Sequence, residues 1–394
     1  MSLIENAGLS LPCQRPIRRR GVDKTTGEPV EVLVRCGTRL RRVCPSCAAL
    51  YKNDVRAVLF QGLRGAVESG ETVVLLTVTA PSFGRVHRVS KDEVWRQGGS
   101  RRAHCPCGKV HGPDDPVGGT PLDGACYDYN GAVRFNHVAG RLWGRTAQEI
   151  GRRAGLMKWS EARGEYIARR PVYAGVAEWQ ARGAIHLHVI LRFPAGAVLG
   201  VYQDRRGRPR SRLVEEASQG AAVFAGPRRS GGRIGWGKQV RADVVRSENS
   251  AFRTAGYLAK VLGYAAKDVG ADVLGDRRPN DEEGWIRQRH HARLQASADL
   301  LGMEVRARGG GAESARRLSR AWGWRGITAR RSRDWGELTL TKARARRVDH
   351  MREQNGSGAP DVAWHPDVRV EYRDEWHNLV NAAIRGWDLV ASSP

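Results

Sequence analysis

The stretch that most constrains this chain is an aliphatic run, residues 185–191, that contains two histidines separated by one leucine. Such a run predicts a β-strand, in which alternate side chains share a face. His186 and His188 would then point the same way, about 6–7 Å apart along the strand. Glu178 lies eight residues before His186, and a tight turn around residues 182–183 would place it on a neighbouring strand. Two imidazoles and a carboxylate form a mixed N/O site for a divalent metal.

Taken alone, the two histidines also fit a strand with a buried, hydrogen-bonded histidine pair and no metal. A second segment, residues 253–267, favours the metal site. Read as a helix at about 100° per residue, it places two phenols and three cations on one narrow stripe: Arg253, Tyr257, Lys260, Tyr264 and Lys267. A phenol with a pKa of about 10 is a poor nucleophile near neutral pH unless a cation or metal stabilises its anion. The alternative is a basic surface helix whose tyrosines reach toward solvent.

Together the two segments resemble the His-hydrophobic-His (HUH) endonucleases, in particular the rolling-circle replication initiators of plasmids and integrative elements in high-GC bacteria. Three motifs occur in the family's order. An apolar strand ending in Thr is matched by residues 73–84, the metal strand by His186 and His188 with Glu178 upstream, and Tyr-x-x-Lys by Tyr257 and Lys260. Some relatives carry a Glu four residues before the tyrosine that helps to release product. Arg253 stands there in this chain, so the resemblance does not extend to that step.

The resemblance implies an α+β fold, with helices packed on a central antiparallel sheet, and a single-strand DNA endonuclease and strand transferase. Mg²⁺ or Mn²⁺ would bind His186, His188 and Glu178, and Tyr257 would form a 5′-phosphotyrosyl link that frees a 3′-OH primer. Lys260 would neutralise charge, and Tyr264 is a candidate second nucleophile. The alternatives are a relaxase or transposase with the same chemistry, or a non-catalytic, sequence-specific DNA-binding regulator.

The charge of the chain fits a nucleic-acid partner. It has 66 Lys and Arg against 41 Asp and Glu, a formal net charge of +25, and such a field attracts polyanions such as origin DNA. A ribosome- or membrane-associated basic protein would share this composition. However, mean hydropathy is −0.50, no apolar run approaches the roughly 20 residues of a membrane span, and no signal peptide is recognisable. We therefore expect a cytoplasmic protein that has no membrane partner.

The seven cysteines are grouped. Cys13, Cys36, Cys44 and Cys47 lie within the first fifty residues, and in a reducing compartment they favour a structural zinc site over disulfides. Free thiols are the alternative. The initiators that the chain resembles carry a similar cysteine cluster, followed by a stretch like residues 48–54.

A second group of metal-binding residue types lies further along the chain. Any four of its five members could hold another zinc ion: His104, Cys105, Cys107, His111 and Cys126. The sequence leaves the choice between His104 and Cys126 open.

The pattern predicts three parts: a zinc module at 1–50, a catalytic domain at 51–275 with a Cys/His insertion at 84–130, and a basic, aromatic region with a cap at 276–394. Within the catalytic domain we expect helices at 51–69 and 131–155, strands at 71–80, 171–178, 185–193 and 238–246, and a flexible basic loop at 203–235. The last forty residues are expected to form a small helical cap.

Arginines interleaved with tryptophans near the C-terminus suit contacts to the DNA backbone together with base stacking. The candidates are Arg316, Arg317, Arg330, Arg331 and Arg333. Ordinary surface charge around core tryptophans is the alternative. Residues 232–239 match a phosphate-binding loop except that Gln239 replaces the Ser or Thr that binds magnesium. We therefore expect no ATPase, so a host helicase would unwind the duplex and a host polymerase would extend the primer.

Overall fold

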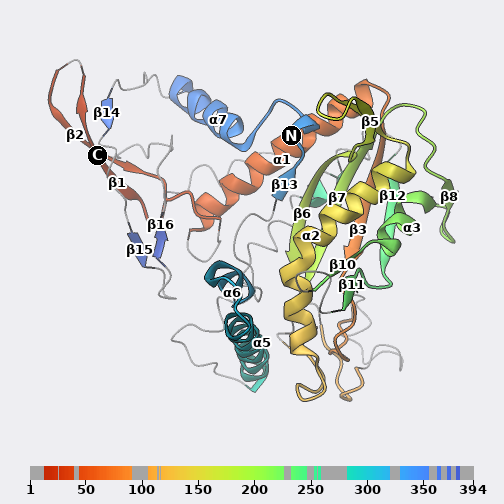
Figure 1. The fold of residues 1–394 in the computed structure, drawn as a ribbon. Coiled ribbons are helices and arrows are strands. Elements are labelled where there is room, and N and C mark those ends of the chain that lie inside the picture. The colour runs from red at the N-terminus through yellow and green to blue at the C-terminus, as the bar shows by residue number, and fades with distance from the viewer. Residues whose placement is uncertain are drawn as a thin grey trace. The chain divides into compact units, whose positions relative to one another are not determined.

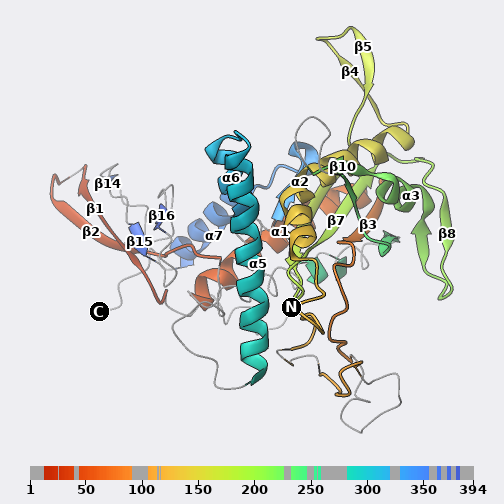
Figure 2. The same cartoon turned by 60° about the horizontal axis from the view of Figure 1, so that its bottom comes forward.

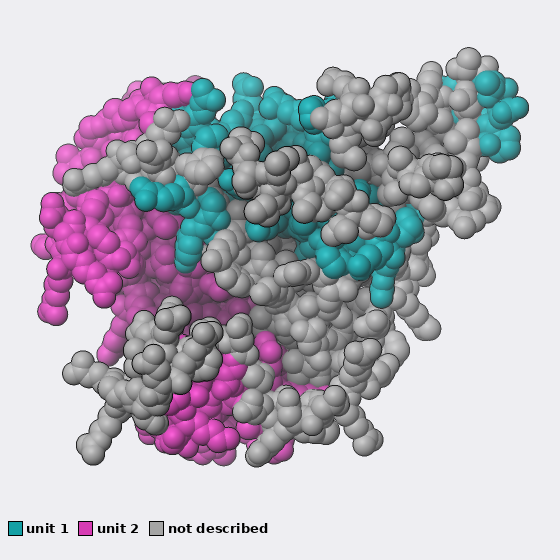
Figure 3. Space-filling view, turned by 180° about the vertical axis from the view of Figure 1, so that it is seen from behind, with its two compact units in different colours: residues 1–65, 251–268, 334–394 teal, residues 66–250, 269–333 magenta. Residues whose placement is uncertain are grey.

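A computed structural model describes residues 13–24, 26–39, 44–90, 105–112, 115, 117–225, 232–245, 253–254, 256–258, 282–319, 329–354, 362–364, 371–373 and 379–381. The chain forms two compact units, which Figure 3 shows in different colours. Unit 1 comprises residues 1–65, 251–268 and 334–394, and unit 2 comprises residues 66–250 and 269–333. The division into three functional parts at residues 50 and 275, which was expected from the sequence, stays a prediction. Within the described residues, no helix combines the length and apolar character that a membrane crossing needs.

Unit 2 is built on a seven-stranded sheet in the order β13-β6-β7-β3-β12-β9-β8, in which every pair of neighbours is antiparallel (Figure 1). The central strands are β3 (Thr72–Thr79), β6 (Val172–Trp179), β7 (Ile185–Phe193) and β12 (Val240–Val245). The outer strands are β13 (Ala329–Arg331), β9 (Pro209–Ser211) and β8 (Val201–Gln203). The predicted α+β class with a central antiparallel sheet is confirmed.

One face of this sheet carries the core of unit 2. Alternate residues of the central strands, such as Val74, Leu76 and Leu191, are fully buried in one cluster with Phe135 and Leu142 of helix α2 (Tyr129–Arg153). Helix α2 begins where the Asp128 carboxylate accepts a hydrogen bond from the Gly131 amide, which satisfies one free N–H of the first turn. Because strand side chains alternate, the residues between these core positions point to the opposite face.

Two helices and a hairpin complete the surroundings of α2. Helix α5 (Glu282–Ala307) buries Leu294, Ala298 and Leu301 against the first turns of α2, together with Leu318 of α6 (Ala312–Ser319). The hairpin of β4 (Met157–Ser160) and β5 (Glu165–Ala168) projects away from the sheet, as Figure 2 shows. Sequence analysis did not predict that hairpin.

The prediction of a flexible basic loop at 203–235 is wrong for most of that range. Besides β8 and β9, it contains α3 (Arg212–Gly220), β10 (Ala222–Phe224) and β11 (Arg233–Gly235). Helix α3 is amphipathic and buries Val214 and Ala217, and Arg210 forms an ion pair with Glu215. The many arginines of this segment therefore hid the apolar spacing of a short amphipathic helix from sequence analysis. The segment resembling a phosphate-binding loop places Trp236 in the core and leads into strand β12, not into a helix.

Unit 1 contains a three-stranded sheet in the order β14-β1-β2, from β1 (Ile17–Asp23), β2 (Pro29–Val34) and β14 (Val362–Trp364). Strands β15 (Glu371–Arg373) and β16 (Leu379–Asn381) form a separate pair. The predicted helical cap is therefore wrong for the described part of the last forty residues. An apolar, aromatic composition there suits short strands as well as a helix.

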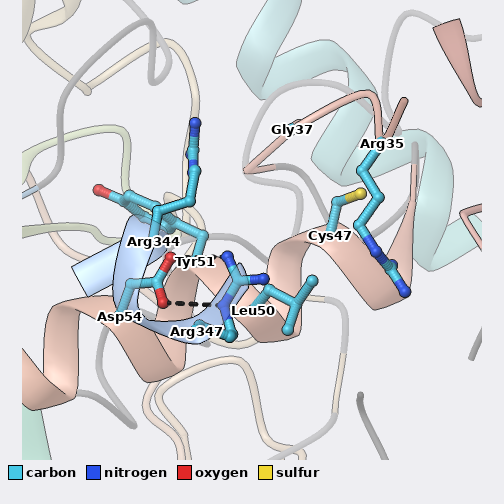
Figure 4. Close-up of a pocket in the computed structure, with 8 residues that line it drawn as sticks. All are labelled: Arg35, Gly37, Cys47, Leu50, Tyr51, Asp54, Arg344 and Arg347. Carbon is cyan, nitrogen blue, oxygen red and sulfur yellow. Dashed lines mark hydrogen bonds and ion pairs between the residues drawn. The ribbon is translucent and has the colours of Figure 1, made fainter. Parts of the chain in front are cut away.

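Helix α1 (Pro45–Glu68) organises the rest of unit 1. Trp335, at the end of the 3-10 helix η4 (Arg333–Trp335), is fully buried and donates to the carbonyl of Val58 at 3.0 Å. The tryptophan fits because residue 62 is glycine: a Cβ there would lie 2.3 Å from the indole nitrogen. Helix α7 (Leu340–Gln354) adds an ion pair of 3.2 Å between Arg347 and Asp54. Figure 4 shows this pair lining a small pocket beside Cys47.

Candidate functional site

The β6–β7 hairpin brings three predicted ligands together. Glu178 on β6 is directly opposite His186 on β7, and His188 follows two residues later on the same face. The turn forms around residues 180–184, where the Gly183 amide donates to Gln180 at 2.8 Å. Gly183 has φ +80°, and a Cβ there would lie 2.3 Å from Leu294. The hairpin turn predicted from the sequence therefore requires glycine for both its conformation and its packing.

The side chains of the three residues converge. Each offers one ligand atom within 4.8 Å of the other two, the imidazole centroids are 4.5 Å apart, and Glu178 Oε2 lies 3.4 Å from His188 Nε2. His186 Nε2 is buried and finds no hydrogen-bond partner among the described residues. A buried polar atom without a partner is costly, so this atom fits a role as metal ligand.

The neighbouring strand orients the second histidine. Thr77 on β3 is opposite His188, and its hydroxyl lies 3.1 Å from His188 Nδ1. A partner on Nδ1 holds the ring and leaves Nε2 directed toward Glu178, as in metal sites whose outer partners orient histidine ligands. Thr79, opposite His186, instead donates to the carbonyl of Gln239.

A side chain of the β6–β7 turn holds the imidazole of His186. Gln180 Nε2 lies 3.0 Å from His186 Nδ1, while Gln180 Oε1 accepts from Arg182 Nε at 2.7 Å. In this arrangement Nδ1 is an acceptor and the imidazole proton lies on Nε2. Binding a metal at Nε2 requires the Gln180 amide to turn so that its oxygen accepts from Nδ1–H. Sequence analysis did not identify Gln180 or Arg182 as members of the site.

The electrostatics keep His186 neutral. Burial and, to a smaller extent, the nearby His188 lower the pKa of His186 to about 4, although Glu178 acts in the opposite direction. The imidazole therefore carries no proton charge at neutral pH, which is the form that binds metals.

The candidate nucleophile belongs to unit 1. Residues 253–254 and 256–258 are helical; Tyr257 is about half exposed, whereas Leu258 is fully buried. The phenol is thus presented to solvent by a helical turn anchored through Leu258. Lys260 and Tyr264 lie outside the described residues.

The four N-terminal cysteines form a compact cluster in unit 1. Cys13 Sγ lies 3.8 Å from Cys44 Sγ and 3.7 Å from Cys47 Sγ, and all four ligand atoms lie within 4.8 Å of one another. Cys44 precedes α1 and Cys47 lies in its first turn. Hydrogen bonds from the Cys36 and Cys47 thiols hold the pKa of Cys13 below its ordinary value. The cluster suits a tetrahedral metal.

The second predicted cysteine and histidine group is corrected by the structure. His87, Cys105, Cys107 and His111 form the cluster. Cys126 is exposed and its thiol contacts Asp123 Oδ2 at 3.1 Å instead. His104 lies outside the described residues. No fixed spacing connects His87 to Cys105, so local pattern reasoning did not find it.

The predicted DNA-binding arginines differ in their surroundings. Arg316 and Arg317 are exposed on α6, and both form ion pairs with Glu313. Arg330 and Arg331 lie on β13, the edge strand beside β6, and Arg333 is exposed just beyond it. The arginines after residue 329 thus flank the sheet that carries the predicted metal ligands. Trp322 and Trp324, two of the tryptophans interleaved with these arginines, fall outside the described residues.

Sequence comparisons relate the chain to known replication proteins. A family model described as "Replication initiator protein, pSAM2" matches residues 4–389. A curated replication initiator protein from Streptomyces ambofaciens is 33% identical over 287 residues, which cover 63% of this chain and 58% of that protein. The chain thus spans somewhat more than half the length of that relative. No solved structure matches. Because the family match covers nearly the whole sequence, the chain belongs to the RepSA family of replication initiator proteins.

Proposed function

We propose that this protein initiates DNA replication by nicking one strand at an origin and remaining attached to the 5′ end. The observation that carries the proposal is the convergence of Glu178, His186 and His188 on adjacent strands, with a buried His186 Nε2 that lacks a described partner. His186 and His188 match the metal strand of the HUH endonucleases that the sequence resembles, Glu178 matches the Glu upstream of it, and family membership supplies the biological context.

The donor set of two imidazoles and one carboxylate forms a mixed N/O site for a divalent metal, and the resemblance to the HUH endonucleases implies Mg²⁺ or Mn²⁺. When bound, such an ion would neutralise the non-bridging oxygens of the scissile phosphate and polarise phosphorus. Thr77 and Gln180 would keep the two imidazoles aimed at it. The half-exposed Tyr257 is accessible to a DNA strand.

In the proposed reaction, the Tyr257 oxygen forms a bond to phosphorus while the bond from phosphorus to the 3′ oxygen breaks. The phenol loses its proton, and the leaving oxygen takes one up as a 3′-OH that primes a host polymerase. The phosphotyrosyl link retains the energy of the phosphodiester, so a later 3′-OH can rejoin the strand without ATP. Lys260 would neutralise the phosphate or the phenolate, and Tyr264 is a second nucleophile to be tested.

The remaining proposals follow from the same role. Structural Zn²⁺ at Cys13, Cys36, Cys44 and Cys47 would stabilise unit 1, and the exposed arginines near β13 would bind the phosphate backbone of origin DNA. A host helicase would unwind the duplex, and the protein would act in the cytoplasm.

The decisive experiment is mass spectrometry of the protein after incubation with single-stranded origin DNA and Mn²⁺. We expect the wild-type chain to gain an oligonucleotide on Tyr257. Tyr257→Phe removes only the phenolic oxygen, so it should bind DNA with near-wild-type affinity at matched salt yet form no adduct. Tyr264→Phe is the matched control and should keep the adduct.

Other outcomes would redirect the proposal. A full adduct in Tyr257→Phe that disappears in Tyr264→Phe would reassign the nucleophile. Absence of any adduct with wild-type protein would favour a DNA-binding regulator. A relaxase or transposase would form the adduct on a substrate other than a replication origin.

A further inference from the structure

The long connection between β3 and α2 contains ligand-type side chains that take no part in the proposed nicking reaction. Four of them meet: His87, Cys105, Cys107 and His111. Their sequence separations do not match a common zinc motif. The grouping arises from the way in which the connection folds back on itself.

The distances between the ligand atoms suit one small ion. His87 Nδ1 and His111 Nε2 are 3.1 Å apart, Cys107 Sγ lies 3.1 Å from His111 Nε2, and Cys105 Sγ lies 3.7 Å from His87 Nδ1. Zinc bonds of about 2.0–2.3 Å to nitrogen and sulfur at tetrahedral angles place neighbouring ligand atoms about 3.3–3.8 Å apart. These three separations are within a few tenths of an ångström of that range, and all four ligand atoms lie within 4.8 Å of one another.

The backbone is shaped for this cluster. A tight turn follows Cys105, because the Gly108 amide donates to the Cys105 carbonyl at 2.9 Å and the Cys105 amide donates to the Lys109 carbonyl at 2.8 Å. Gly108 has φ +88°, which glycine adopts without strain. In addition, the Arg88 amide donates to Cys105 Sγ at 3.3 Å, which helps to hold the sulfur in place.

One histidine already has the outer partner of a metal ligand. His111 is buried, and its Nδ1 lies 2.6 Å from Asp115 Oδ2. The other oxygen of Asp115 accepts from the Val117 amide at 2.8 Å. The carboxylate therefore holds the proton on Nδ1 and leaves the Nε2 lone pair for the cluster, as in carboxylate–histidine–zinc triads.

We propose that His87, Cys105, Cys107 and His111 form a closed structural Zn²⁺ site, with Asp115 as the positioning residue for His111. The ion would cross-link the described parts of this connection. It joins the segment around residue 87 to the segment around residue 105. Both are then tied to residues 117–120, because the His87 amide donates to the Thr120 carbonyl and the Gly119 amide donates to the His87 carbonyl.

The site has a consequence for the β6–β7 turn. The connection leads to Tyr127, whose hydroxyl donates to the Arg182 carbonyl at 2.5 Å. The Arg182 guanidinium in turn donates to the carbonyls of Ala80 and Pro81 and to Gln180, which contacts His186. The zinc site thus holds the connection that buttresses the turn beside the proposed catalytic metal.

The first test is the zinc content of purified protein, measured by elemental analysis. We expect about two zinc ions per chain, one at each closed cluster. His87→Ala and Cys107→Ser should each lose one. Cys126→Ser and His104→Ala are matched controls and should lose none. Loss of zinc from Cys126→Ser, or full zinc in His87→Ala, would overturn the assignment. Asp115→Asn should weaken zinc binding roughly 10–100-fold.

A second test uses the wild-type chain and therefore does not depend on whether a variant folds. Cys107 and Cys126 are both exposed, but only Cys107 would be a zinc ligand. Thiol alkylation followed by peptide mass spectrometry should label Cys126 quickly and Cys107 slowly, and chelation should raise the rate at Cys107 alone. Equal labelling of the two thiols before chelation would refute the site. Neither test depends on nicking activity, so both remain informative if the proposed nuclease function fails.

Discussion

The two cysteine-containing clusters and the cluster on the β6–β7 hairpin differ in the way that separates structural from catalytic metal sites. Each cysteine cluster offers four ligand atoms, whereas the hairpin offers three, all nitrogen or oxygen. Four ligands complete a tetrahedron, while three leave coordination positions for a substrate. The number and type of donors therefore predict a different chemistry for each site.

The backbone that holds the cysteine clusters also differs from the backbone that holds the hairpin ligands. The cysteine clusters lie on turns, an irregular connection and the first turn of α1. The hairpin ligands lie on two central strands of a seven-stranded sheet. A site on a rigid sheet keeps its geometry without the ion, so its loss should affect rate more than folding.

The largest expected effect is on folding, at the first closed cluster. Cys44 is fully buried, and structural zinc in small modules contributes roughly 10 kcal/mol or more to folding. We expect Cys44→Ser to lose one zinc ion and most of the soluble yield, while the specific activity of the protein that does fold falls much less. Zinc analysis, yield and activity per folded chain check this. Full zinc content in folded Cys44→Ser would contradict a structural zinc site at this cluster.

His186→Ala should have the converse effect. Metal ions supply several kcal/mol of transition-state stabilisation, and about 1.4 kcal/mol corresponds to a factor of ten. Nicking should therefore fall roughly 1,000-fold, with zinc content and origin binding nearly unchanged. A gel-based nicking assay with Mn²⁺ measures the rate, and His350→Ala, an exposed histidine of α7, is the control. Normal nicking by His186→Ala would show that the hairpin metal is not catalytic.

A smaller effect is expected from the partner of His188. Thr77→Val keeps the side-chain shape but removes the hydroxyl 3.1 Å from His188 Nδ1. The concentration of Mn²⁺ needed for half-maximal nicking should rise about tenfold. Thr79→Val is the matched control, because that hydroxyl bonds to Gln239 and to neither histidine. Equal shifts in both variants would argue that Thr77 has no orienting role.

The last effect concerns stability and a histidine pair outside all three clusters. His290 and His291 are buried on α5, and burial lowers their pKa values to about 4 and about 3. Because the folded state binds protons less readily than the unfolded chain, stability is lost as pH falls below about 6.5. Each histidine would contribute at most about 2 kcal/mol between pH 6.5 and 5.

The measurement is the difference in melting temperature between pH 7 and pH 5 for wild-type protein and His291→Leu. Zinc release in acid should lower both proteins equally, so a smaller fall in the variant isolates the histidine. Identical falls would show that His291 does not titrate over this range.

The sequence predicted the central strands and α2 within about two residues at most boundaries, because aliphatic periodicity is a local signal. It also predicted the turn at Gly183 and the group of Glu178, His186 and His188, since register on a two-strand hairpin follows from the chain itself. His87, Gln180 and Asp115 were missed: their roles arise from a folded connection and from the geometry of a turn. The helix at 212–220 was missed because arginines masked its apolar positions.

The edge strand β13 determines when the sheet of unit 2 can be completed. Ser332, immediately after β13, pairs with Tyr173 at the start of β6, although the two are 159 residues apart in the chain. A ribosome must therefore deliver most of the chain before β6 acquires its second neighbour, and pairings of such long range form slowly. A chain that stops before residue 329 keeps an open edge beside the β6–β7 hairpin, where a second truncated chain could add its own strand.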